Sequence, residues 1–185
     1  MTDSHDDGKG RRPGARSPSA DEAVAAANAR FYDAIEHGDM DAMARVWLPE
    51  DDGGESVSCV HAGWPVLRGR AEVLRSFALI MANTEYIQFF LTDVEVSVAG
   101  ADADTAVVTC TENILTGAPA DAEPDPEEDL GGADDDPGGP GPLIGGLVVA
   151  TNVFHRVAGE WRLWAHHGSP VLLGEDEPGD DDAAA

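Results

Sequence analysis

The chain has 185 residues, of which 36 are acidic and 11 basic, and its formal net charge is −25. This length is enough for one domain with a well-buried core and short for two, and the hydrophobic fraction of 42% is ordinary for a globular protein. The negative charge makes nucleic acids and anionic membranes poor partners, so we interpret it as surface solvation, with recruitment of a basic partner as the alternative.

Cysteine content and hydropathy favour a reduced, cytoplasmic compartment. Cys59 and Cys110 are too few for a disulfide framework, and both fall in expected strands, where a free cysteine behaves as a small buried hydrophobe. The N-terminal stretch has no apolar segment typical of a secretory signal, and no apolar run approaches the roughly 18 residues of a membrane span.

Order is expected to begin at the segment "SADE". Residues 1–18 are polar and rich in glycine, proline and arginine, which favours a disordered tail. Ser19 and Glu22 have the spacing of a capping box, in which each residue hydrogen-bonds the backbone of the other. Apolar residues then recur at helical spacing, so residues 20–37 are predicted to form an amphipathic helix.

Two further helices flank a short strand. Asp39 is the expected cap of a second helix that ends before Pro49. A solvated loop then leads to a strand over residues 57–61, and apolar spacing predicts a third helix over about 69–83.

From Ile87 onward the hydrophobic period changes to two, which is typical of strands. The alternation runs to Leu91 on one parity and resumes from Val94 on the other, which predicts a bulge near Thr92 and Asp93 in a strongly curved strand. Further strands are expected over residues 105–115, 148–157 and 161–167.

Two segments with little apolar content interrupt or follow these strands. Residues 118–142 contain nine acidic residues, six prolines and five glycines. So little surface can be buried there that a disordered insertion is favoured over a functional loop. Residues 174–185 contain six acidic residues and are expected to form a solvated tail. The predicted domain therefore spans residues 19–173.

Helices that precede a run of antiparallel strands indicate the α+β class, with helices segregated to one face of a sheet. We expect a curved, mostly antiparallel sheet wrapped around three N-terminal helices. Such a cone has an open mouth, and ligand pockets tend to lie in concavities of this kind.

With this element order, the chain resembles the SnoaL-like branch of the nuclear transport factor 2-like superfamily. The resemblance rests on "ARFYDAIEHGDMDAMARVW", "CVHAGWPVLRGRAEVLRSF" and "TNVFHRVAGEWRLWAHHGSP". It implies the cone fold, but the superfamily includes isomerases, cyclases, dehydratases, hydrolases and non-catalytic association domains. Members often dimerise sheet to sheet, so the resemblance implies a homodimer in which Trp164 and Val153 contribute.

Ketosteroid isomerisation, the best understood chemistry of this fold, needs a tyrosine, a protonated carboxylic acid and a carboxylate base. Alignment puts Phe31 at the position of the tyrosine, with Tyr32 one step round the helix. His61 falls near the base and Asn152 near the protonated acid. None of these residue types is retained, so the sequence argues against steroid isomerisation in that form.

Strand parity predicts which side chains enter the cone. Trp161 and Leu163 are the expected core pair of the last strand, which sends His167 inward and leaves Trp164 and His166 outward. The predicted pocket consists of Phe31, His61, Trp64, Asn152, Phe154 and His167.

His61 and His167 are the candidate catalytic residues, because a histidine is a general base near neutral pH. The alternative for His61 is that it pins the turn that follows it by donating to a nearby carbonyl. Neither HExxH nor CxxC occurs, so no metal and no cofactor is expected. Glu112 shares the parity of core residues, although an outward, solvated glutamate is favoured.

The leading hypothesis is a protein that binds a small apolar molecule between His61 and His167. If it is an enzyme, it is a cofactor-independent isomerase, dehydratase or hydrolase that uses histidine proton transfer. The rival is a non-catalytic association module whose pocket is filled by its own side chains. A void of about 300 Å³ or more favours ligand binding, and a collapsed interior favours the rival.

Overall fold

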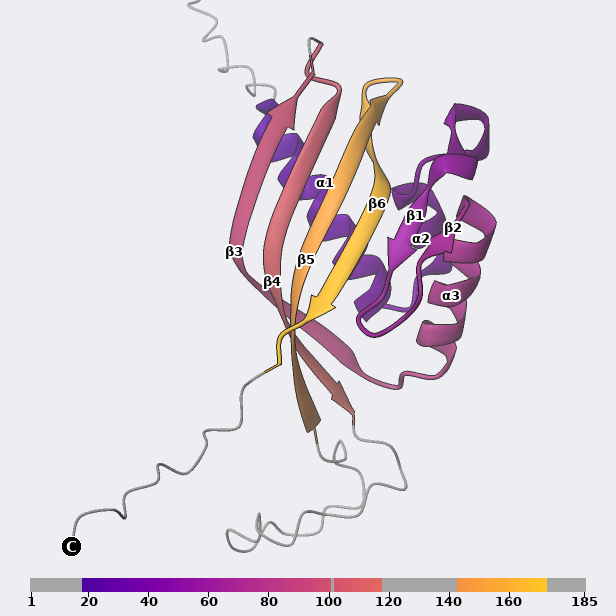
Figure 1. The fold of residues 1–185 in the computed structure, drawn as a ribbon, viewed down its shortest axis with the longest axis vertical. Helices are drawn as coiled ribbons and strands as arrows, with labels where there is room; N and C mark the ends of the chain where they lie inside the picture. The colour runs from indigo at the N-terminus through magenta and orange to yellow at the C-terminus, as the bar shows by residue number, and fades with distance from the viewer. Residues whose placement is uncertain (1–17, 101, 118–142, 173–185) are drawn as a thin grey trace, which may run out of the picture.

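The computed structural model describes residues 18–100, 102–117 and 143–172 (Figure 1). Apart from Pro18, the segments expected to be disordered lie outside the described residues: 1–18, 118–142 and 174–185. The domain bounds and the disorder therefore remain predictions.

The three expected helices are present: α1 (Ala20–Glu36), α2 (Met40–Val46) and α3 (Arg70–Ala82). The capping box at the start of α1 is confirmed, because the Ser19 hydroxyl accepts from the Glu22 N–H and the Glu22 carboxylate accepts from the Ser19 N–H. The loop expected after α2 instead contains two short 3₁₀ turns, η1 (Glu50–Asp52) and η2 (Gly54–Ser56).

In the described part of the chain, six strands form one curved sheet in the order β2-β1-β6-β5-β4-β3 (Figure 1). Strand β1 is parallel to β6, and all other neighbours in the sheet are antiparallel. Their bounds are β1 Ser58–Val60, β2 Leu67–Arg68, β3 Ile87–Ala99, β4 Thr105–Gly117, β5 Leu143–Val157 and β6 Glu160–Pro170. Strand β2 was not predicted, because two residues are too few to show a period. The α+β class and the mostly antiparallel, curved sheet are confirmed.

Two bulges re-aim side chains in this sheet. In β3 the register with β4 shifts between Thr92 and Glu95, and Asp93 has a φ of 51°, so the bulge predicted there is confirmed. In β6 the partners of Val153 and Phe154 are Ala165 and Leu163, which leaves Trp164 as an extra residue. The second bulge was not predicted, and it reverses the parity of every residue that follows it in β6.

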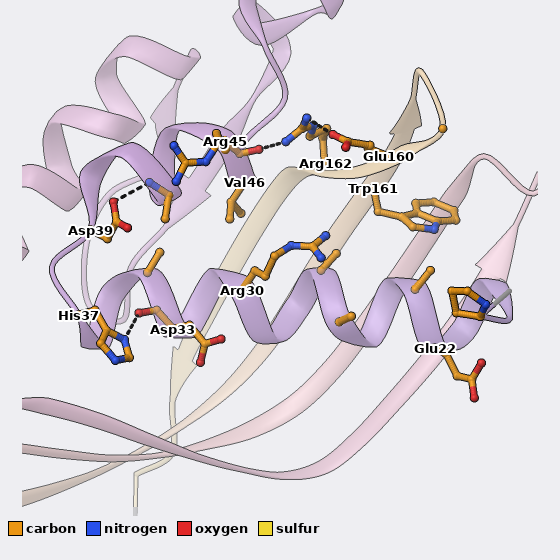
Figure 2. Close-up of a pocket in the computed structure, with 17 residues that line it drawn as sticks. Glu22, Arg30, Asp33, His37, Asp39, Arg45, Val46, Glu160, Trp161 and Arg162 are labelled. Carbon is orange, nitrogen blue, oxygen red and sulfur yellow. Dashed lines mark hydrogen bonds and ion pairs between the residues drawn. The ribbon is translucent and has the colours of Figure 1, made fainter. Parts of the chain in front are cut away.

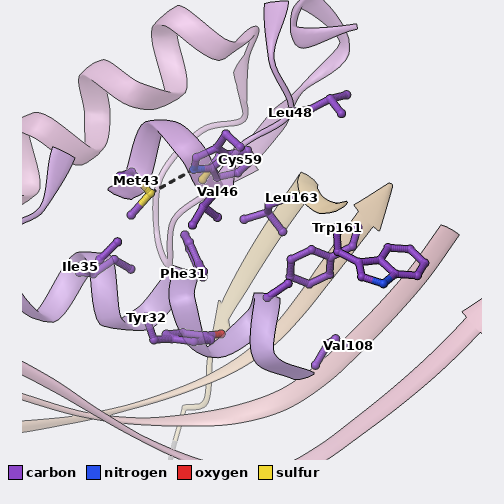
Figure 3. Close-up of a cluster of buried hydrophobic side chains, with 14 of the residues drawn as sticks. Phe31, Tyr32, Ile35, Met43, Val46, Leu48, Cys59, Val108, Trp161 and Leu163 are labelled. Carbon is purple, nitrogen blue, oxygen red and sulfur yellow. Dashed lines mark hydrogen bonds between the residues drawn. The ribbon is translucent and has the colours of Figure 1, made fainter. Parts of the chain in front are cut away.

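The core lies between α1 and the concave face of the sheet, with α2 and α3 closing its side (Figures 1 and 3). Phe31 is 1% exposed and meets the ring of Trp47 edge to face, with centroids 6.1 Å apart. Trp47 in turn donates its indole N–H to the Met43 sulfur at 3.2 Å. Burial of these large side chains fixes α1 across the sheet. None of the described helices has the length and apolar character that a membrane crossing requires.

Candidate functional site

A cavity of about 160 Å³ lies between α1, α3 and the inner face of the sheet. Its wall is mostly apolar, and its polar members come from four separate elements. They are Tyr32 of α1, His61 after β1, Glu112 of β4 and His166 of β6. The cavity is smaller than the roughly 300 Å³ that would favour ligand binding outright, yet it is close to the roughly 150 Å³ of an apolar cavity that binds benzene.

Glu112 is the buried acid of this cavity. The Tyr32 hydroxyl donates to Glu112 Oε1 at 2.8 Å and lies 3.4 Å from the Cys110 sulfur. Burial raises the pKa of Glu112 to about 7, while the hydrogen bond from Tyr32 opposes the rise. The expectation that Glu112 points outward is wrong, since it is 4% exposed. Strand β4 pairs with β5 without a register shift, so the inward parity of Ala106 persists to Glu112.

Asn152 of β5 connects the acid to a histidine. Its amide nitrogen donates to Asn28 Oδ1 at 2.8 Å and to the Tyr32 hydroxyl at 3.0 Å. Its oxygen is therefore left to accept from His166 Nδ1 at 2.6 Å. This network assigns the proton of neutral His166 to Nδ1 and leaves Nε2 with a lone pair. Burial, together with the charges of His61 and His167, lowers the pKa of His166 to about 3.

His61 is held from the other side of the cavity. Its Nε2 lies 2.8 Å from the Ser76 hydroxyl, which itself donates to the Val73 carbonyl at 2.7 Å. Since the only hydroxyl proton of Ser76 is used, His61 donates from Nε2, and Nδ1 is the unprotonated nitrogen. Burial lowers the pKa of His61 to about 4, so the ring is neutral at pH 7. The turn-pinning alternative named a carbonyl partner, and the partner of His61 is instead a helix serine.

The structure corrects the expected orientation of the two histidines of β6. His167 is exposed on the outer face, whereas His166 is 7% exposed and lines the cavity. The bulge at Trp164 inserts one residue after Leu163 and so reverses the parity that the sequence predicts. The cavity therefore places His166, not His167, near His61, with ring centroids 6.4 Å apart.

The other predicted pocket residues divide into three groups. Phe31 lines the cavity, as does His61. Asn152 and Phe154 are fully buried but lie behind the cavity wall rather than in it. Trp64 is 41% exposed and meets the His61 ring edge to face with centroids 5.2 Å apart, so it flanks His61 from the surface.

Sequence reasoning missed Asn28, Tyr32, Ser76 and His166. A signal for two of them was present, because Asn28 and Tyr32 share a helix face with Phe31 and Ile35 at spacings of three and four residues. In the described part of the chain, no three His, Cys, Asp or Glu side chains are grouped so that they could hold a metal.

A larger groove of about 710 Å³ lies on the outside of α1 (Figure 2). It runs between α1, α2 and the turn from β5 to β6, and five of its lining residues are alanines. Arg30, Arg45 and Arg162 face it together with four carboxylates, and Arg162 pairs with Glu160. None of the four polar residues of the inner cavity reaches this groove.

Comparison with known proteins identifies the family. The model of the SnoaL-like domain matches residues 24–129, which is more than half of the chain. The chain belongs to the SnoaL-like family. The resemblance stated from the sequence is thus confirmed, and so is its nuclear transport factor 2-like fold.

Three relatives of this SnoaL-like protein differ widely in description. A proposed dehydratase of the NTF2-like family from Streptomyces avermitilis is 55% identical, with a TM-score of 0.69 and coverage of 83% of this chain and 97% of that one. A proposed calcium/calmodulin-dependent protein kinase type II association domain from Thiobacillus denitrificans is 25% identical, with a TM-score of 0.56 and coverage of 80% and 94%. The F-box protein SKIP8 of Arabidopsis thaliana is 25% identical over 155 residues, which are 84% of this chain and 52% of the relative. The chain thus spans about half the length of this curated relative.

Proposed function

We propose that this SnoaL-like protein binds a small, mostly apolar organic molecule in the inner cavity and dehydrates it by proton transfer, without a cofactor. The observation behind the proposal is one buried carboxyl group, Glu112, with a pKa of about 7, that shares a cavity with two neutral imidazoles. A pKa near neutrality suits a group that both gives and takes protons. The description of the 55% identical relative as a proposed dehydratase supports the same reaction.

In the proposed dehydration, His61 is the general base and Glu112 is the general acid. His61 Nδ1 takes a proton from the carbon next to the one that bears the hydroxyl group. The electron pair of that C–H bond forms the new C=C bond as the C–O bond breaks. Protonated Glu112 gives its proton to the departing hydroxyl, which leaves as water. The proton on His61 then returns to Glu112 through solvent, which restores the site.

The test begins with binding and ends with turnover. Thermal shifts across a library of small hydroxy compounds should identify ligands, and mass spectrometry should detect the product that has lost water. Glu112→Gln should abolish turnover, while Asp33→Asn, a carboxylate lost from the outer groove, should leave it unchanged. A library without a single binding compound would contradict the proposal, and so would full turnover by Glu112→Gln.

A second candidate is a non-catalytic association module that dimerises through the outer face of the sheet. Phe90, Val149 and Trp164 are all exposed there, between 38% and 50%, and the 25% identical relative is described as an association domain. Apolar side chains gathered on one exposed face favour a partner surface. In the proposed homodimer, Trp164 and its strand neighbour Val153 contribute to the interface.

Sedimentation tests the dimer independently of the chemistry. Trp164→Asp should sediment as a monomer where the wild type sediments as a dimer, because a buried unpaired carboxylate opposes association. Leu79→Asp replaces an apolar residue that is 57% exposed on α3 rather than on the sheet, so it adds the same charge and controls for charge alone. An unchanged mass for Trp164→Asp would rule out this interface.

A further inference from the structure

The side chains of Tyr32, His61 and His166, which line the inner cavity, already donate their hydrogen bonds within the protein. The Tyr32 hydroxyl donates to Glu112, His61 donates from Nε2 to Ser76, and His166 donates from Nδ1 to Asn152. Each of these groups has one proton to donate when neutral. Among the described side chains that line the cavity, the carboxyl proton of Glu112, present in its protonated form, is the donor that remains for a ligand.

Several hydrogen-bond acceptors of the cavity, in contrast, are unused. Among the described residues, Glu112 Oε2 and His166 Nε2 have no hydrogen-bond partner, and no fully buried side-chain nitrogen or oxygen lacks one. Both atoms therefore border accessible space. His166 Nε2 lies beside another lining residue, because a methyl group built on Gly168 would come within 3.6 Å of it. Among the described residues, the polar contact of His61 Nδ1 is a long one, to the Cys59 sulfur at 3.9 Å.

The charged residues and the volume of the inner cavity further restrict the class of ligand. No lysine or arginine is among the described residues that line the cavity, so a buried anion would meet Glu112 and no opposing charge. Arginine side chains line the outer groove instead, at Arg30, Arg45 and Arg162. A volume of about 160 Å³ accommodates one six-membered ring, since a cavity of roughly 150 Å³ binds benzene.

We infer that the ligand of this site is an uncharged alcohol or phenol of about one ring, whose hydroxyl donates a hydrogen bond into the cavity. The inference rests on the proposed function and names its substrate class. A hydroxyl group can donate to His166 Nε2 and accept from protonated Glu112 at the same time, and the proton that it accepts from Glu112 is the one with which it departs as water. A ketone or an ether lacks the proton that the unused acceptors need.

Phenol and toluene form a matched pair that tests this inference. The two have the same shape, and only phenol has a donor in place of the methyl group. Phenol cannot undergo the proposed dehydration, so its binding is measured without turnover. Calorimetry at neutral pH should show phenol binding about two- to tenfold more tightly than toluene, the range expected for one net hydrogen bond. Benzoate, an anion, and benzylamine, a cation, should bind more weakly than phenol.

Two variants test whether the preference for phenol depends on His166 Nε2. Gly168→Ala places a methyl group 3.6 Å from His166 Nε2 and 3.1 Å from the Val148 side chain, which must shift slightly. It should reduce the preference for phenol, with circular dichroism as the check on folding. His167→Gln, on the outer face, should keep the preference. The ligand series on the wild type remains decisive if Gly168→Ala does not fold.

The outcomes separate the inference from the proposed function. Toluene equal to phenol, or benzoate or benzylamine tighter than phenol, would overturn the inference while the cavity remained a binding site. A preference for phenol that survives Gly168→Ala unchanged would also overturn it. Binding by none of the four compounds would overturn both the inference and the proposed function.

Discussion

The inner cavity and the outer groove share one helix, yet their walls have opposite chemistry. The groove holds about 710 Å³ and is lined by arginines and carboxylates, whereas the cavity holds about 160 Å³ and is lined by one acid and two imidazoles. Adjacent residues of α1 divide between them: Arg30 faces the groove, and Phe31 faces the cavity. The smaller hollow is the better candidate site, because burial there raises the pKa of Glu112 toward neutrality.

The largest expected effect is the difference in stability between the Phe31→Ala and Arg30→Ala variants. Phe31→Ala removes a ring that is 1% exposed and packed against Tyr32, Trp47 and Phe77. It should lower the free energy of unfolding by about 3–5 kcal/mol. Arg30→Ala, on an exposed position of the same helix, should change it by no more than about 0.5 kcal/mol. Urea denaturation measures both, and equal losses would mean that the two sides of α1 are not as different as the structure shows.

A second comparison concerns how stability depends on pH when the buried Glu112 or the exposed Asp33 is replaced. The folded-state pKa of Glu112 is raised from 4.5 to about 7, so the folded protein binds more protons than the unfolded chain between these pH values. Stability contributed by this group is therefore lost as pH rises from about 4.5 to 7, by on the order of 3 kcal/mol. Glu112→Gln should remove this loss, and Asp33→Asn in the groove should not. The measurement is the unfolding free energy against pH, and parallel curves for wild type and Glu112→Gln would contradict the burial of a titrating acid.

The two cavity histidines act in the opposite direction. Burial lowers the pKa of His61 to about 4 and that of His166 to about 3, from 6.5. The unfolded chain then binds more protons, and the stability that the neutral rings contribute is lost as pH falls below about 6.5. The difference between wild type and Glu112→Gln cancels this histidine contribution, which is why the pH series compares those two proteins.

A β-bulge can be predicted from the sequence only where the hydrophobic alternation within that one strand changes parity. The bulge in β3 was found because apolar residues stop on one parity at Leu91 and resume on the other at Val94. The bulge in β6 was missed because Trp161 and Trp164 are large apolar residues on opposite parities, so a shift leaves no trace in the hydrophobic pattern. Such a shift sends every later side chain to the other face.

Glu112 shows a different limit. Its inward parity was evident from Val108 and Cys110, but an unpartnered buried carboxylate is costly, which favoured an outward orientation. The group that makes burial acceptable is Tyr32, which lies 80 residues earlier and meets Glu112 only in the fold. Pairings between distant elements cannot be derived from periodicity, which describes one element at a time.

A third comparison separates the neighbouring histidines of β6. His166→Phe keeps a ring in the buried position but leaves the oxygen of Asn152 without its donor, which should cost about 1–3 kcal/mol. His167→Phe, on the exposed face, should change stability by no more than about 0.5 kcal/mol. The two variants are compared by urea denaturation at neutral pH. Greater destabilisation by His167→Phe than by His166→Phe would contradict the inward orientation of His166. It would also contradict the reversal of parity by the bulge at Trp164.

The smallest expected effect concerns which nitrogen of His61 has the proton. Ser76 fixes it at Nε2, since the serine hydroxyl already donates to Val73 and can only accept from the ring. Nitrogen-15 spectra at neutral pH should show His61 in the Nε2–H form, and Ser76→Ala should give a mixture of both forms with a loss of about 1 kcal/mol of stability. Ser56→Ala, in η2 outside the cavity, is the matched control and should leave the His61 signals unchanged. A wild-type His61 protonated at Nδ1 would deprive the cavity of its proposed base, because the lone pair would then face Ser76 and not the ligand.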